Sequence, residues 1–205
     1  MLFKFKYNDV KIINKNTIYN GFLSFVKYYF THKLFNGGWS KEICREVVEH
    51  NIIGAVLPYD HILDKVILVE QIRIPSLKEK ITPWLLEIIA GIKENNETME
   101  ELIYREAKEE ANITIQRCHY IFNYLSSPGC SNERVYLYIG KIDSKLVNHG
   151  YICGSKKEHE DIRVHVIDRK IAYQWIKDGI INNAATIISL QWLQLYYFTF
   201  TTIWN

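Results

Sequence analysis

Short apolar runs separated by turn residues recur along the chain and constrain its fold more than any other feature. Runs rich in Val, Ile, Tyr and Phe are typical of β-strands. They lie at residues 22–31, 43–48, 52–58, 65–74, 84–90, 118–125, 134–142 and 162–167. Charged residues interrupt the first two runs, and a turn at Asn36, Gly37 and Gly38 separates them, so we expect a small antiparallel sheet within residues 1–50. The denser runs that follow predict a larger sheet in a second domain, residues 51–205.

Three segments carry helical signals. Thr98, followed three residues later by Glu101, forms a capping box and predicts a helix over residues 99–111. A second helix is expected over residues 169–177, ended by the stop signal Asp178-Gly179, and a third from residue 183 to about 197. The combination predicts an α+β fold, in which a mixed β-sheet is sandwiched between helices beside the small N-terminal β-subdomain.

Composition excludes several classes of function. With 25 basic and 23 acidic side chains the net charge is only +2, which argues against a nucleic-acid binder that works by neutralising phosphates. The four cysteines form no CxxC pair, and a chain of this size needs no disulfides, so we expect a reduced, cytoplasmic protein. Polar residues interrupt the apolar C-terminal stretch before it reaches the ~20 apolar residues of a membrane span. A core or interface helix is expected there.

Three glutamates share one face of the predicted helix at residues 99–111. Glu106, Glu109 and Glu110 are related by i, i+3 and i+4 spacing, which places their carboxylates within about one turn. Like charges at this spacing repel by a few tenths of a kcal/mol per pair, so the pattern alone is typical of a solvated charged face. A carboxylate-lined helix can also hold a hard divalent cation such as Mg²⁺, which prefers oxygen ligands.

Residues at fixed offsets surround these glutamates. Reading from Gly91, the segment contains Gly, five residues, Glu97, seven residues, Arg105-Glu106, an aliphatic residue, one residue and then Glu-Glu. This resembles the signature of the Nudix hydrolases, with six of its seven fixed identities present. The departure is Asn112, where the family has glycine. Asparagine is the usual second choice for a left-handed residue after a helix, so the replacement should be mild.

The resemblance extends over nearly the whole chain and is closest to the branch of the family that hydrolyses ADP-ribose. The segments that carry it are residues 34–36, 70–74, 83–91, 126–129, 158–166 and 183–193, with Pro128 lying 15 residues past the signature. It implies metal-assisted hydrolysis of ADP-ribose to AMP and ribose 5-phosphate. The implied cofactor is Mg²⁺, with Mn²⁺ as a possible substitute.

The resemblance also implies roles within the signature. A metal ion would be held by the backbone carbonyl of Ala90 and by the carboxylates of Glu106 and Glu110, with Glu109 supplying further coordination. Arg105 would be the orienting residue, which pairs with a neighbouring glutamate and holds the loop against the helix. An ordinary surface salt bridge is the alternative reading of Arg105.

Further residues are implied outside the signature. An acidic loop at residues 158–161 would close over the substrate, with Glu160 as a metal ligand and Glu158 as the candidate general base. Several glutamates could reach the same water, so the identity of the base stays open. Arg73 and, from a partner subunit, Arg45 are candidates for phosphate or adenine contact, because a guanidinium pairs with phosphate or stacks on a base. Glu133 is a candidate for contact with the terminal ribose.

The resemblance implies a homodimer that shares its N-terminal sheet, so that each active site receives residues from both subunits. Two other functions stay open. A related hydrolase of another nucleoside diphosphate sugar, such as GDP-mannose, would carry the same signature. A non-catalytic nucleotide-sensing module would usually lack the signature carboxylates, which are intact here.

Overall fold

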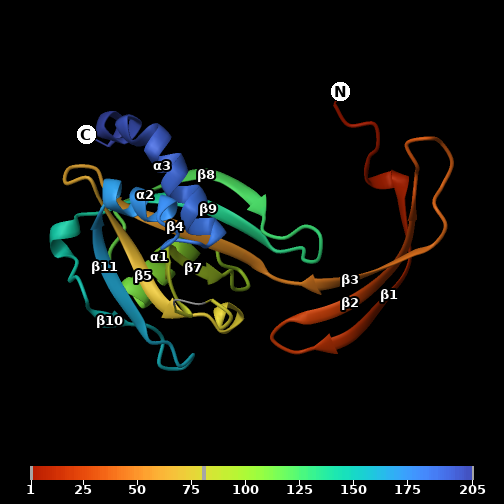
Figure 1. Cartoon of the computed structure of the whole chain (residues 1–205), viewed down its shortest axis with the longest axis horizontal. Coiled ribbons are helices and arrows are strands. Elements are labelled where there is room, and N and C mark those ends of the chain that lie inside the picture. The colour runs from red at the N-terminus through yellow and green to blue at the C-terminus, as the bar shows by residue number, and fades with distance from the viewer. Residues whose placement is uncertain (1, 80–81, 205) are drawn as a thin grey trace. The chain divides into compact units, whose positions relative to one another are not determined.

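The computed structural model describes residues 2–79 and 82–204 and divides them into two compact units (Figure 1). Unit 1 comprises Met1–Asn51 and Leu125–Arg134, and unit 2 comprises Ile52–Tyr124 and Val135–Asn205. The loop of residues 125–134 therefore leaves the sheet of unit 2 and packs in unit 1. There, Val48 N–H donates to the carbonyl of Cys130, and His50 N–H donates to Asn132 Oδ1.

Unit 1 contains an antiparallel sheet of three strands among its described residues. The strands are β1 (Val10–Asn20), β2 (Ser24–His32) and β3 (Ile43–Glu49), with β2 in the centre. The predicted antiparallel sheet is confirmed, but β1 was missed. Every residue of β1 is exposed, so both of its faces tolerate polar side chains. The sequence of β1 therefore lacks the alternation of apolar and polar residues that indicates a strand.

Unit 2 contains one eight-stranded sheet within the described ranges. Its main path runs β10-β11-β5-β4-β9-β8, while β6 pairs with β5 and β7 pairs with β4. The strands are β4 (Ile52–Asp60), β5 (Lys65–Ile72), β6 (Trp84–Glu87), β7 (Ile89–Ile92), β8 (Arg117–Leu125), β9 (Arg134–Lys141), β10 (Ile152–Cys153) and β11 (Ile162–Asp168).

One predicted strand, residues 84–90, is two strands in the structure. The break falls at Ile88, whose N–H donates to the Thr186 hydroxyl at 2.9 Å instead of to a neighbouring strand. After this break the chain changes partner from β5 to β4. The change matters for function because it carries residues 89–92 under the helix that bears the signature glutamates.

Helices cover both faces of this sheet (Figure 1). On β4, Ala55 and Leu57 belong to the apolar cluster that includes residues of α2 (Arg169–Lys177) and α3 (Ala184–Ile203). Val56 points to the opposite face and belongs to the cluster of α1 (Met99–Ala111). This alternation is expected of a strand buried on both faces. The predicted α+β fold, a sheet between helices, is confirmed.

The last two helices are joined to the β4–β5 turn by a buried arginine. Arg169, 1% exposed, opens α2 and donates through Nε and Nη2 to the carboxylate of Asp64 at 2.6 and 2.9 Å. Its Nη1 donates to Gln194 of α3, and its guanidinium lies 3.9 Å from the centre of the Tyr197 ring. Helix α3 continues to Ile203, six residues beyond the predicted end. No helix in the described part of the chain is both long and apolar enough to cross a membrane.

Candidate active site

Helix α1 begins and ends where its sequence dictates. Thr98 Oγ1 accepts from the Glu101 N–H at 3.2 Å, and the Glu101 carboxylate accepts from the Thr98 N–H at 2.7 Å, which completes the predicted capping box. At the other end Asn112 adopts the left-handed conformation, with φ of 51°. Its N–H donates back to the carbonyl of Lys108. Asn112 therefore adopts the left-handed conformation that we expected of the residue at this position of the signature.

Two facing glycines bring α1 close to the sheet. Gly91 on β7 pairs with Gly54 on β4. A Cβ on Gly91 would lie 1.7 Å from Glu106 Oε1, and a Cβ on Gly54 would lie 2.6 Å from a methyl carbon of Leu102. Both distances are too short for any side chain. Glycine at this position of the signature thus leaves free the space that the Glu106 carboxylate occupies, and a larger residue would have to displace Glu106.

Arg105 donates hydrogen bonds to several parts of the signature segment. Its Nε donates to Glu97 Oε1 at 2.8 Å, and its Nη2 donates to the carbonyl of Ile92 on β7. Its Nη1 donates to Glu106 Oε1 at 2.7 Å and to Glu109 Oε2 at 3.2 Å. One guanidinium therefore fixes the loop before α1, the end of β7 and two carboxylates of the helix face.

Two of the three helix glutamates are buried. Glu110 is 3% exposed, and one of its oxygens accepts from the Ala90 N–H at 3.1 Å. Burial raises the pKa of Glu110 well above its usual value, and the charge of Glu106 adds to the effect. Burial likewise raises the pKa of Glu106 to about 7, against the opposing effect of Arg105. These are carboxylates removed from water, where a cation would stabilise them.

The acidic loop reaches the same region through Glu160. Its carboxylate accepts from the Ser155 N–H at 2.8 Å, and its charge raises the pKa of both Glu106 and Glu110. The Gly154 N–H donates to the carbonyl of Glu109, which attaches the start of the loop to the end of α1. Glu158 lies on the same loop with an exposed side chain. The structure therefore brings Glu160 beside the helix glutamates and leaves Glu158 on the solvent side.

Arg73 stands close to this cluster and has a partner that the sequence reasoning missed. Its guanidinium pairs with the carboxylate of Glu87 on β6, with Nη2 donating to Oε2 at 2.7 Å and Nε at 3.0 Å. Burial acts to lower the pKa of Arg73, but the Glu87 pair and the charges of Glu110 and Glu160 raise it overall. Glu87 was detectable as a lone carboxylate in an otherwise apolar run four residues before Gly91.

The remaining expected contacts belong to unit 1. Arg45 is an exposed residue of β3, and its Nη1 donates to the carbonyl of Cys44 at 2.8 Å. Glu133 lies in the 125–134 loop, with Oε2 at 3.6 Å from His50 Nδ1. The residues that the structure brings together are therefore those of unit 2: Ala90, Gly91, Glu97, Arg105, Glu106, Glu109, Glu110, Glu160 and Arg73.

The donor set fits a hard divalent cation. Carboxylate oxygens from one helix face and from Glu160, together with a backbone carbonyl oxygen from the strand that carries Ala90, are the ligand type that Mg²⁺ prefers. Among the described residues no three acidic, histidine or cysteine side chains already converge on one point. Glu106 is engaged by Arg105, and Glu110 is engaged by the Ala90 N–H. These buried, mutually repelling carboxylates suit an added positive charge.

Known proteins resemble this chain over almost its whole length. The ADP-ribose pyrophosphatase of Escherichia coli (strain K12) is 44% identical over 197 residues, which cover 96% of this chain and 93% of that protein. The ADP-ribose pyrophosphatase of Haemophilus influenzae is 40% identical over 204 residues, or 98% and 93% of the two chains. A GDP-mannose pyrophosphatase from Pectobacterium atrosepticum is 31% identical over 185 residues, covering 90% of this chain and 93% of that protein.

A crystal structure of an ADP compounds hydrolase has a similar fold. The two structures superpose with a TM-score of 0.68, covering 91% of this chain and 95% of the other, at 16% sequence identity. This likeness confirms the predicted fold class. No protein-family model matches the chain.

Proposed function

Because the chain belongs to the ADP-ribose pyrophosphatase family, we propose that it hydrolyses the diphosphate bond of ADP-ribose to AMP and ribose 5-phosphate with the help of a divalent cation. The observation that carries the proposal is the pair of buried carboxylates, Glu106 and Glu110, beside Ala90 on the sheet. Buried acids whose pKa values are strongly raised are typical of functional sites.

The proposed metal residues are the carboxylates of Glu106, Glu110 and Glu160 and the backbone carbonyl of Ala90, and the proposed ion is Mg²⁺ or Mn²⁺. When bound, such an ion neutralises diphosphate charge and makes a nearby water more acidic. Arg105 keeps Glu106 aimed at the site by holding one of its oxygens at 2.7 Å. Its bonds to the loop and to β7 make this orientation part of the fold.

Glu158 and Glu109 are the proposed proton-handling residues. The Glu109 side chain is 46% exposed and stands on the same helix face as the buried acids, so it can reach a water that approaches from solvent. The exposed carboxylate of Glu158 lies on the loop that the Gly154 N–H attaches to α1 through the carbonyl of Glu109. A general base needs this combination of access to water and proximity to the reacting group.

Arg73 is proposed to bind the diphosphate. Its pair with Glu87 leaves Nη1 without a contact to that carboxylate, so one edge of the guanidinium can face a phosphate oxygen. Arg45 and Glu133 are proposed as further substrate contacts, with Arg45 supplied by a partner subunit.

A homodimer is proposed from unit 1. Its described residues contain one buried side chain, Val26, while β1 is exposed throughout and aromatic side chains such as Tyr19, Phe22 and Phe35 are 60–86% exposed. A three-stranded sheet with so little buried surface and several exposed aromatic side chains would gain stability from a covering partner. A measured mass of twice 24.3 kDa in sedimentation supports the dimer, and a single copy contradicts it. The four free cysteines fit the reducing cytoplasm that we propose as its compartment.

The deciding experiment is product analysis of ADP-ribose incubated with the protein, with Mg²⁺ and with excess chelator. We expect AMP and ribose 5-phosphate only with the metal. Glu110→Gln should lower turnover by several orders of magnitude, because it removes the negative charge of a proposed metal ligand with little change in side-chain volume. Glu100→Gln, on an exposed position of the same helix, is the matched control and should leave turnover unchanged.

GDP-mannose is the second candidate substrate, because a protein named GDP-mannose pyrophosphatase is 31% identical over 90% of this chain. Faster turnover of GDP-mannose than of ADP-ribose in the same assay would move the specificity and keep the site. Turnover of neither compound, nor of a nucleoside triphosphate, would favour the nucleotide-sensing module over an enzyme.

A further inference from the structure

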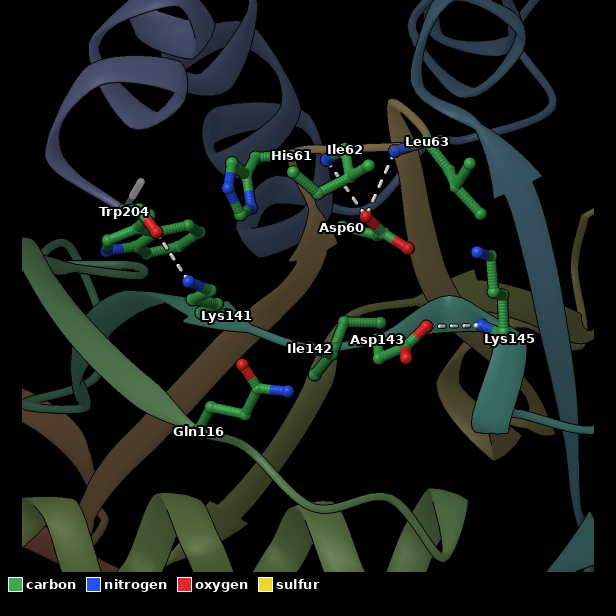
Figure 2. Close-up of a pocket in the computed structure, with 10 residues that line it drawn as sticks. All are labelled: Asp60, His61, Ile62, Leu63, Gln116, Lys141, Ile142, Asp143, Lys145 and Trp204. Atoms are coloured by element: carbon green, nitrogen blue, oxygen red, sulfur yellow. Dashed lines mark hydrogen bonds between the residues drawn. The ribbon is translucent and has the colours of Figure 1, made fainter.

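A second polar pocket, of about 290 Å³, lies in unit 2 at the end of β4 (Figure 2). It is formed by the β4–β5 turn, the residue before β8, the segment after β9 and Trp204. Ala90 of the candidate active site pairs with Ala55, five residues before Asp60 on β4. At about 3.3 Å per strand residue, roughly 16 Å of strand separates that site from this pocket.

The pocket contains a buried histidine that lacks partners. His61 is 8% exposed, and neither of its ring nitrogens has a hydrogen-bond partner among the described residues. Its ring meets Trp204 edge-on, with centroids 5.8 Å apart and an interplanar angle of 80°. A buried polar atom without a partner is costly, so two such atoms on one ring point to a missing hydrogen-bonding group in the pocket.

The other polar groups around this histidine are mostly hydrogen-bond donors. Lys141 stands beside it and donates to the carbonyl of Trp204, which uses one of the three N–H bonds of the ammonium group (Figure 2). Lys145 is an exposed residue on the opposite side of the pocket, and Gln116 contributes a side-chain amide. The pocket therefore offers two cations and several N–H groups to a ligand.

The two acids of the pocket accept hydrogen bonds within the fold, and those of Asp60 involve both of its oxygens. One oxygen of Asp60 accepts from two backbone N–H groups of the turn, and the other accepts from the N–H and hydroxyl of Ser144 at 2.9 and 2.6 Å. Asp143 accepts from the backbone N–H of Lys145 at 3.0 Å. Asp60 thus has no free lone pair to offer a cation, and four donors within the fold stabilise its negative charge.

We propose that this pocket binds a phosphate group, either inorganic phosphate or a small phosphate monoester. His61 and Lys141 donate to its oxygens from inside the pocket, and Lys145 adds charge at the edge. The excess of donors selects an acceptor-rich anion, and charge-assisted bonds from Lys to phosphate are strong ones. The volume suits a phosphate or a phosphorylated small molecule, at the lower limit of ligand pockets. The proposal does not depend on the hydrolytic activity.

The test follows the ring nitrogens of His61 by NMR in the full chain labelled with ¹⁵N-histidine. His61→Phe keeps an aromatic ring against Trp204 and identifies the His61 signals by their loss. Inorganic phosphate and ribose 5-phosphate are titrated separately, against sodium chloride at matched ionic strength. We expect saturable shifts of the His61 signals with half-saturation at about 1 mM or below for at least one of the two. The tighter of the two identifies the source of the phosphate group.

Lys145→Gln is the second variant, because an exposed side chain can be changed without risk to folding. It should raise the half-saturation concentration about three- to fivefold, as loss of an exposed ion pair does. Lys170→Gln, on an exposed position of α2, is the matched control and should leave it unchanged. Shifts that stay linear in phosphate, that sodium chloride reproduces, or that are equal in the two lysine variants would overturn the proposal and leave a water-filled cavity.

Discussion

Gly91→Ala tests whether the glycine of the signature exists to make room for Glu106. The three atoms nearest to a Cβ at this position all belong to Glu106, at 1.7, 2.1 and 2.6 Å. The alanine must therefore push the Glu106 side chain away from its 2.7 Å bond to Arg105. Overpacking of this kind costs about 1–3 kcal/mol, partly offset by the 0.5–1 kcal/mol that alanine gains over glycine in a strand.

A double-mutant cycle isolates this effect. We expect Gly91→Ala to destabilise the wild-type chain by about 1–2 kcal/mol, and to cost nothing or to stabilise when Glu106 is already alanine. The measurement is urea unfolding with chelator present, together with turnover of the single variant, which should fall sharply because Glu106 is displaced. Gly129→Ala is the control: no heavy atom lies within 4 Å of its Cβ, and its φ is not positive. An equal cost of Gly91→Ala in both backgrounds would refute the steric account.

Three further outcomes are expected. Without metal, stability should fall as pH rises from about 4.5 to above 7, because burial raises the pKa of Glu106 to about 7. At pH values below the pKa of Glu106 in the unfolded chain, both states are protonated and the penalty is absent. The penalty from Glu106 amounts to about 3 kcal/mol, and Glu106→Gln should reduce the pH dependence in urea unfolding, while the part that arises from the raised pKa of Glu110 remains. Arg169→Met should cost about 3 kcal/mol in the same assay, the lower end for a broken buried pair because Asp64 is 38% exposed. Asn112→Gly should keep turnover and change the melting temperature only slightly, since both residues accept a positive φ.

Elements with strong local signals were predictable from the sequence. Helix α1 matches its predicted range because the capping box fixes its start and Asn112 its end. The strands β4, β5 and β9 of unit 2 were found because burial on both faces makes them almost continuously apolar. The missed strands lack that signal: β1 is exposed on both faces, and β10 has only two residues. The break at Ile88 depends on a hydroxyl 98 residues away, which no local pattern contains.

The candidate site was predictable only where the spacing of residues along the sequence determines which side chains share a face. The spacing of Glu106, Glu109 and Glu110 placed them on one face, but it could not tell that Glu106 and Glu110 are buried while Glu109 is not. That difference arises because β7 passes beneath the helix, which is a property of the tertiary fold. The Arg73–Glu87 pair was missed for the same reason, since it joins neighbouring strands 14 residues apart in the chain.

The burial of Glu106 and Glu110, the proposed metal ligands, also lowers the stability of the fold. Glu106 and Glu110 lose water, repel one another, and are only partly compensated by Arg105 and the Ala90 N–H. A fold selected for stability alone would place apolar residues at these positions. Other buried positions of α1 do carry apolar residues, namely Leu102, Ile103 and Ala107. A cation that binds only the folded state adds stability that grows with the logarithm of its concentration once this exceeds its Kd. At Glu106 and Glu110, stability without metal and the proposed activity with metal are therefore opposed. Glycine at position 91 leaves the space in which the Glu106 carboxylate stays buried.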